Sequence, residues 1–140
     1  MRQYFTHFAL GAYLVAQVLP AFTLAGDLTF GWKAVFLSGV GTYGALRGGV
    51  LNERGYTTAC LTGFSANLTF IAALVAAYWG TVSRARRLGQ LALGCGAASV
   101  IVLLFSSERF VPNIGCGLWL MTMAMLAFHR VQPKPATLSE

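Results

Sequence analysis

Arg84-Ala-Arg86-Arg87 is the densest block of positive charge in the chain, and long apolar runs flank it, Ala59–Gly80 before it and Leu88–Phe105 after it. Guanidinium groups are costly to bury in hydrocarbon, and bacterial-type inner membranes hold them on the cytoplasmic side. We therefore predict that this stretch is a cytoplasmic loop between two transmembrane helices. Its three arginines, Arg84, Arg86 and Arg87, are then topology determinants that can also contact lipid headgroups.

The composition is that of a membrane protein. Of the 140 residues, 56% are hydrophobic and only 10% are charged, whereas a soluble domain carries roughly 25% charged residues. A helix needs about 20 apolar residues to cross the hydrocarbon core, so the chain has room for four crossings and short connections. The formal net charge of +6 lies in the connections between apolar runs. This placement indicates retention of those connections in the cytoplasm, with the lipid bilayer and no nucleic acid as partner.

The apolar runs predict an all-α integral membrane protein with four transmembrane helices in a single domain, residues 1–130. The expected spans are about 4–25, 58–80, 88–105 and 114–129, with both termini in the cytoplasm. The first run is longer than the apolar part of a signal peptide, so it is expected to be a span. Residues 131–140 contain Pro133 and Pro135 and no apolar period, which is typical of a flexible tail.

The segment from Asp27 to Tyr56 admits two interpretations. Apolar residues recur at helical spacing, and they predict either an interfacial or re-entrant helix at about 32–46 on the outer face, or a fifth span at about 34–51. The count of basic residues on each side nearly ties. Arg47 and the many glycines would insert poorly, so we favour four spans. The expected interfacial anchors are Trp32, Tyr43 and Tyr56.

Uncharged polar residues are the candidates for contacts inside the membrane: Gln17, Asn67, Ser99 and Thr122. The simplest interpretation is a hydrogen bond between spans one and two, from Gln17 to Asn67, worth about 0.6 to 2 kcal/mol. Tyr13, Ser99 and Thr122 can join it, and the alternative is a small polar binding pocket. No ionisable residue falls near the centre of a predicted span, which argues against a proton-coupled exporter.

The cysteines and histidines predict no cofactor, no metal site and no enzyme. Cys60, Cys95 and Cys116 lie inside apolar runs without the spacing of a metal site, although Cys60 and Cys116 are close enough to the outer ends to leave a disulfide open. His7 and His129 fall near the cytoplasmic ends, where two facing histidines can hold a haem iron, but ordinary interface positions explain them equally well. Ser106, Ser107 and Glu108 lie a membrane thickness away from both histidines, so no catalytic set forms.

Four landmarks carry a resemblance to a known group. They are Leu19-Pro20-Ala21, Gly31-Trp32, Ala66-Asn67 and Gly117-Leu118-Trp119-Leu120. This layout resembles a group of small bacterial inner-membrane proteins with about four spans and no assigned chemistry. Two positions depart from the pattern, because Leu68 stands where a proline follows the Ala-Asn pair and the second tryptophan of the last motif is absent. The resemblance implies a bacterial inner-membrane architecture and no mechanism.

We therefore expect a small membrane protein that acts without catalysis, by helix–helix interaction with a membrane-protein partner or with a second copy of itself. An immunity protein against a pore-forming toxin and an accessory subunit of a membrane complex both fit this expectation. The alternative is a small channel or carrier built on the polar residues of the spans.

Overall fold

Five helices and three short strands make up the computed structural model, which describes residues 2–47, 54–106 and 109–128. The helices are α1 (Arg2–Val18), α2 (Gly31–Leu46), α3 (Arg54–Tyr78), α4 (Val82–Ser106) and α5 (Ile114–Ala127). The strands are β1 (Pro20–Leu24), β2 (Asp27–Phe30) and β3 (Phe110–Pro112). The described part is mostly helical, as the sequence predicts.

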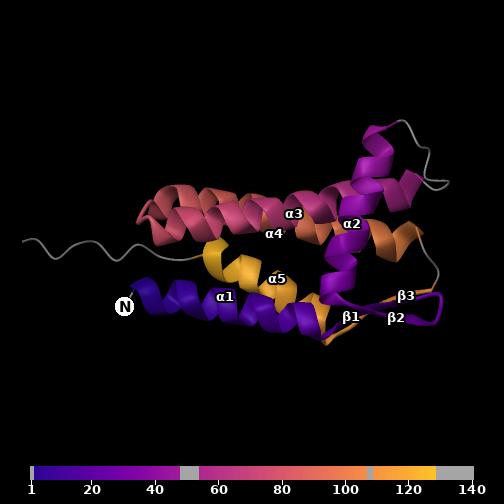
Figure 1. Cartoon of the computed structure of the whole chain (residues 1–140), viewed down its shortest axis with the longest axis horizontal. Coiled ribbons are helices and arrows are strands. Elements are labelled where there is room, and N and C mark those ends of the chain that lie inside the picture. The colour runs from indigo at the N-terminus through magenta and orange to yellow at the C-terminus, as the bar shows by residue number, and fades with distance from the viewer. Residues whose placement is uncertain (1, 48–53, 107–108, 129–140) are drawn as a thin grey trace, which may run out of the picture.

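Four helices run lengthwise beside one another, and the fifth crosses them (Figure 1). Helix α3 packs along α4, α4 packs on α5, and α5 packs on α1. Helix α2, which matches the helix predicted at 32–46, lies across the bundle at the end that carries the strands. We call this end the sheet end. The opposite end, with the connection between α3 and α4 and the N-terminus, is the arginine end.

Two of the described helices, α3 from Gly55 to Tyr78 and α4, are long and apolar enough to cross a membrane by length and composition. Helix α5 is apolar but shorter. The interior between the lengthwise helices is built from small side chains and a few large ones. Its buried residues are Ala9, Tyr13, Ala66, Phe70, Ala73, Ala92, Met123 and Leu126.

The first predicted span, 4–25, is wrong at its end, because helix α1 stops at Val18 and a strand follows it. Pro20 lacks an amide hydrogen and disfavours helical backbone in the residue before it, which ends the helix. Strand β1 then turns back into β2 through Ala25 and Gly26, whose φ angles of 53° and 95° are both positive. Such a two-residue turn matches the twist of a hairpin.

The hairpin belongs to a three-stranded antiparallel sheet in the order β2-β1-β3. Thr23 pairs with Leu28 on one side and with Val111 on the other. The connection between the last two predicted spans therefore contains β3, which pairs with the first hairpin. The backbone amide of Asn113 donates to the carbonyl of Ala21 at 2.8 Å, which joins the start of α5 to β1.

The arginine cluster is not a loop, and this corrects the prediction made from it. Gly80, at φ 80°, ends α3: its amide donates to the carbonyl of Ala77, and the Thr81 amide donates to the carbonyl of Ala76. This pair of bonds is a common glycine-terminated helix end. Helix α4 begins at Val82, six residues before the predicted 88, because its first turns are polar and hydropathy alone places them outside a span. Arg84, Arg86 and Arg87 are exposed on these first turns.

Some predictions fall on residues outside the described ranges. They are the tail at 131–140 and His129, which is the last residue of the span predicted at 114–129. Helix α5 ends at Ala127, within the described part of that span.

Candidate functional site

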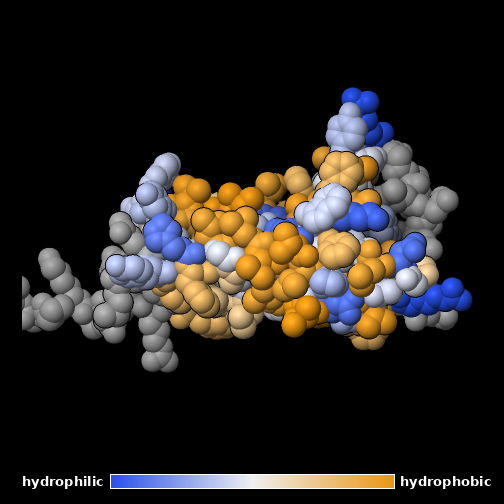
Figure 2. All heavy atoms as spheres, turned by 60° about the horizontal axis from the view of Figure 1, so that its bottom comes forward, coloured by the Kyte–Doolittle hydropathy of each residue, from blue (hydrophilic) through white to orange (hydrophobic). Residues whose placement is uncertain are grey.

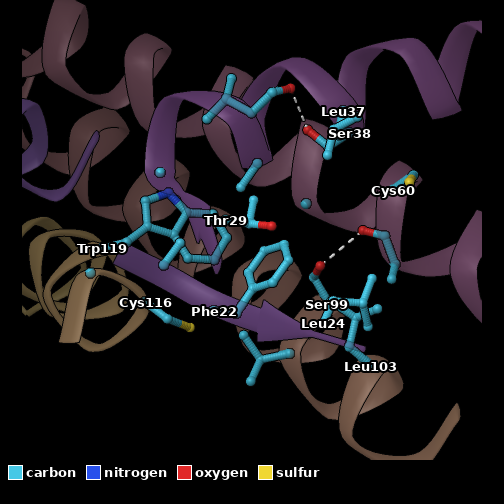
Figure 3. Close-up of a pocket in the computed structure, with 18 of the residues that line it drawn as sticks. Phe22, Leu24, Thr29, Leu37, Ser38, Cys60, Ser99, Leu103, Cys116 and Trp119 are labelled. Atoms are coloured by element: carbon cyan, nitrogen blue, oxygen red, sulfur yellow. Dashed lines mark hydrogen bonds between the residues drawn. The ribbon is translucent and has the colours of Figure 1, made fainter. Parts of the chain in front are cut away.

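A cavity of about 120 Å³ lies at the sheet end, between the sheet and the helices (Figure 3). Residues from all eight helices and strands line it. The sheet and the crosswise α2 line it together with the lengthwise helices. Its lining is largely apolar, and none of the described residues that line it is charged.

Asn67 on α3 is the hub of a hydrogen-bond network beside the cavity. Its Oδ1 accepts from the Tyr13 hydroxyl at 2.8 Å and from the Trp119 indole Nε1 at 3.0 Å, and its Nδ2 donates to the carbonyl of Gly63 at 2.8 Å. The two bonds to Oδ1 occupy both of its lone pairs. The Tyr13 ring also packs against Phe70, with centroids 4.8 Å apart. The network thus joins α1, α3 and α5 at one atom.

The predicted bond from Gln17 to Asn67 is wrong. Gln17 donates from Nε2 to the carbonyl of Tyr13 in its own helix, at 3.5 Å. Tyr13, one turn earlier, supplies the partner from α1, because its buried ring reaches α3 and carries the hydroxyl to Asn67. Gln17 still lines the cavity, together with Asn67.

The other two predicted polar contacts, Ser99 and Thr122, differ in position, because only Ser99 lines the cavity. Ser99 on α4 lines the cavity and donates its hydroxyl to the carbonyl of Ala59 on α3 at 2.8 Å. Thr122 is fully buried, donates to the carbonyl of Trp119 at 2.7 Å and does not line the cavity. Three of the four predicted residues therefore line one cavity, and the fourth bonds only the backbone of its own helix among the described residues.

Thr29 on β2 lines the cavity, although it is not among the polar contacts predicted from the sequence. It is 6% exposed, it lines the cavity, and its hydroxyl points into it among Trp119, Phe22 and Ser99 (Figure 3). No hydrogen bond joins this hydroxyl to another residue in the part of the chain that the structure describes. A strand assignment would have found it, because burial alternates from exposed Leu28 to buried Thr29 to exposed Phe30.

The predicted interfacial anchors are divided between surface and cavity. Trp32 and Tyr43 are exposed on α2, and the guanidinium carbon of Arg47 lies 4.9 Å from the centre of the Tyr43 ring. Tyr56 instead lies at the start of α3 and lines the cavity. The arginine cluster is at the opposite end of the bundle.

No disulfide forms between Cys60 and Cys116, which are both free and both line the cavity. Within residues 2–47, 54–106 and 109–128, no group of three or more histidine, cysteine, aspartate or glutamate side chains could hold a metal ion. His7 is exposed on α1. A haem site shared with His129 stays untested, since His129 is outside the described residues.

The landmarks of the family resemblance come together around this cavity. The Gly31 amide donates to the carbonyl of Leu19 at 3.1 Å, and Asn67 bonds Trp119. A comparison of the chain with models of known protein families, with curated proteins and with solved structures finds no match. The resemblance therefore stays a prediction.

Proposed function

We propose that the chain is an integral protein of a bacterial-type inner membrane in which α1, α3, α4 and α5 cross the bilayer. The arginine end is then cytoplasmic and the sheet end faces outward. Large apolar side chains such as Ile71, Leu91 and Ile101 are exposed on the lengthwise helices, and Figure 2 shows hydrophobic surface over the middle of one face with hydrophilic residues toward both ends. Lipid is the environment in which such a surface is favourable.

The lengths of α3 and α4 support this placement. Helices α3 and α4 have 25 residues each, which is about 37 Å at 1.5 Å per residue, against a hydrocarbon core of about 30 Å. Helices α1 and α5, with 17 and 14 residues, are shorter than the core, and the sheet continues both at the outer end. On α2, exposed Trp32, Phe36, Val40 and Tyr43 form one apolar stripe, which suits a helix in the outer interface.

Cysteine labelling tests the sidedness. Ser83, beside the arginines, and Asp27, in the hairpin, are both exposed. We expect a membrane-impermeant maleimide added to intact cells to label Asp27→Cys and to leave Ser83→Cys unlabelled until the cells are opened. Labelling of Ser83→Cys in intact cells would invert the proposed orientation.

Within the membrane, we propose that the protein acts without catalysis, by packing against a partner helix. This proposal rests on three exposed glycines, one on each of the proposed transmembrane helices α1, α4 and α5: Gly11, Gly94 and Gly117. A Cβ atom built on any of them would have no atom of the described residues within 4 Å, apart from its chain neighbours and its own helix backbone. Glycine in a helix interior costs about 1 kcal/mol relative to alanine, and nothing within the described chain offsets that cost.

Small residues between large ones let a second helix approach closely. On α4, Gly94 lies between exposed Leu91 and exposed Ile101 on one face, with half-buried Ala98 one turn on. The same pattern recurs on α5, where exposed Ile114 and Met121 flank Gly117. These faces are the proposed contact surfaces for the partner.

Affinity purification from native membranes in mild detergent tests the partner. We expect a stoichiometric membrane protein, or a second copy of the chain, to copurify with the wild type and to be lost from Gly94→Leu or Gly117→Leu. The matched control is Ile101→Leu, which keeps an apolar side chain on the same face and should retain the partner. Full recovery of the partner with both glycine variants would contradict the proposal.

Two identities for the partner belong to this class, a larger membrane complex and a pore-forming toxin. A toxin partner makes the chain an immunity protein, so cells that express it should survive a toxin that kills cells without it. Equal killing in both strains across the candidate toxins would remove the immunity version and leave the accessory subunit.

The cavity favours a second candidate function, a small carrier. Gln17, Asn67 and Ser99 place amide and hydroxyl groups around one internal space, which is where a small solute would be held. Purified protein in liposomes should then pass that solute, and Gln17→Leu with Asn67→Leu should change the flux. Flux no greater than in empty liposomes would dispose of this candidate.

A further inference from the structure

The cavity at the sheet end has a definite size. Its volume is about 120 Å³, and an apolar protein cavity of about 150 Å³ is large enough to hold benzene. The space therefore suits one six-membered ring, or an apolar group of similar bulk, rather than a whole lipid chain. Phe22, Leu103 and Trp119 supply apolar and aromatic walls for it.

The walls of the cavity exclude charge from the ligand. No charged side chain is among the described residues that line it, and burying an ion without a partner is far more costly than burying a neutral polar group. The part of the ligand that enters must be uncharged.

The hydrogen-bonding groups of the cavity are mostly committed to the protein itself. Ser99 and Ser38 donate their hydroxyl protons to the carbonyls of Ala59 and Val35, and the amide oxygen of Asn67 accepts from two donors. Thr29 differs from them, because its hydroxyl points into the cavity, is accessible there, and forms no bond to any described residue. Such a hydroxyl is free to bond an oxygen on a ligand that enters the cavity, and a hydrogen bond of this kind contributes about 0.5–1.5 kcal/mol.

We propose that this cavity binds an uncharged, ring-sized apolar group that carries one hydroxyl or carbonyl oxygen, and that Thr29 forms the hydrogen bond to that oxygen. Ser99, beside it, has acceptor lone pairs left to receive a ligand hydroxyl. The ligand class is a neutral phenol-like or quinone-like group, held at the sheet end beside Trp119. This site is independent of the helix partner proposed above.

Trp119 reports on the site directly. Its indole lines the cavity, whereas Trp32 and Trp79 are 59% and 77% exposed and do not line it. The protein with Trp32→Phe and Trp79→Phe therefore fluoresces from the cavity alone. A bromine atom quenches an indole that it touches, so 4-bromophenol serves as the polar probe and bromobenzene, which lacks the hydroxyl, as its matched apolar probe.

We expect 4-bromophenol to quench Trp119 saturably in detergent micelles and to bind more tightly than bromobenzene. Thr29→Val keeps the shape and removes the hydroxyl, so it should weaken 4-bromophenol by about two- to tenfold and leave bromobenzene unchanged. Thr29→Ser should bind like the parent. Partition of the probes into micelles is the same for every variant and cancels in the comparison.

Two results would overturn the proposal: quenching that rises without saturation, as mere partition into the micelle predicts, or equal affinity of Thr29→Val and the parent for 4-bromophenol. Ala34→Leu on α2 keeps the test decisive if Thr29→Val does not fold. Ala34 lines the cavity, so the larger side chain should occupy it and abolish saturable quenching by both probes. Retention of that quenching in folded Ala34→Leu protein would also overturn the proposal.

Discussion

The two halves of the bundle pack differently although the same lengthwise helices form both. Toward the arginine end the helices are in close contact: Ala73, Ala92 and Met123 are fully buried, and a side chain on Gly89 of α4 would lie 2.8 Å from the backbone nitrogen of Ala127 on α5. We call this the closed half. Toward the sheet end, β1, β2 and α2 join the lengthwise helices around the cavity of about 120 Å³. We call this the open half.

The helices are held together in different ways in the two halves. In the closed half, small residues let helix backbones meet, and packing alone holds them. In the open half, hydrogen bonds take over where the packing is incomplete, with Asn67 at the boundary binding α1 and α5 to α3. We infer that the closed half supplies rigidity and that the open half is the part able to admit a ligand. Single substitutions in each half test that division.

Enlarging a side chain should be costly in the closed half and tolerated in the open half. Ala73 is fully buried in the core, so Ala73→Leu should lower the free energy of unfolding by about 2–3 kcal/mol through overpacking. Ala34→Leu, the matched change at the cavity, should lower it by less than about 1 kcal/mol because the space is there. Unfolding in detergent micelles with increasing dodecyl sulfate, followed by circular dichroism, measures both. Equal losses would mean that the halves do not differ.

Removing the hub between the halves should cost less. Asn67→Leu leaves the Tyr13 hydroxyl and the Trp119 indole without their acceptor, so we expect a loss of about 1–2 kcal/mol in the free energy of unfolding. Tyr13→Phe should then cost less in the Asn67→Leu background than in the wild type, because the bond is already gone. Strictly additive losses in this double-mutant cycle would indicate that the bond contributes nothing to stability.

Two glycines on α4 should respond in opposite directions. Gly89→Ala puts a methyl group against the backbone of Leu126 and Ala127, and it should lower the free energy of unfolding by about 1 kcal/mol. Gly94→Ala faces outward with nothing within 4 Å, and it should raise that free energy by up to about 1 kcal/mol through helix propensity. The same unfolding titration compares them. A loss at Gly94 as large as at Gly89 would show that the isolated chain needs the outward glycine.

We expect the smallest effects on stability from substitutions in the turn between β1 and β2. Ala25 has a positive φ of 53°, which is unfavourable for alanine, and asparagine before glycine is preferred in this type of turn. Ala25→Asn should therefore raise the free energy of unfolding by about 0.5 kcal/mol, whereas Ala25→Val should lower it by about 1 kcal/mol. The melting temperature in detergent should shift in the same two directions. A melting temperature for Ala25→Val equal to that of the wild type would speak against this turn.

The local pattern predicted the helices well and the strands not at all. Apolar period and length located all five helices, including the one at 32–46, because both signals are contained in a few turns of chain. The strands Pro20–Leu24 and Phe110–Pro112 are short and apolar. From the sequence, the first looks like the end of a span and the second like part of a connection between spans. No signal near either segment predicts that it pairs with the other.

The candidate site was predicted in part, for the same reason. Gln17, Asn67 and Ser99 stand out as polar residues in apolar runs, and all three line the cavity. Thr29 carries no such signal, because it lies in a segment whose strand geometry depends on pairing with β1. Thr122 gives the same local signal as Ser99 and yet bonds within its own helix, so polarity alone could not separate them.

Helix propensity, apolar period and composition are local properties, so the residues alone predict where the chain is helical. They also place the densest positive charge between the second and third apolar runs. The tertiary structure alone decided that a hairpin and a distant third strand meet, that Asn67 bonds Tyr13 and Trp119 rather than Gln17, and that a cavity remains between them. These features join residues as many as 90 positions apart, as in the bond from Asn113 to Thr23. Only the packing of the whole bundle sets which of these distant groups come within reach.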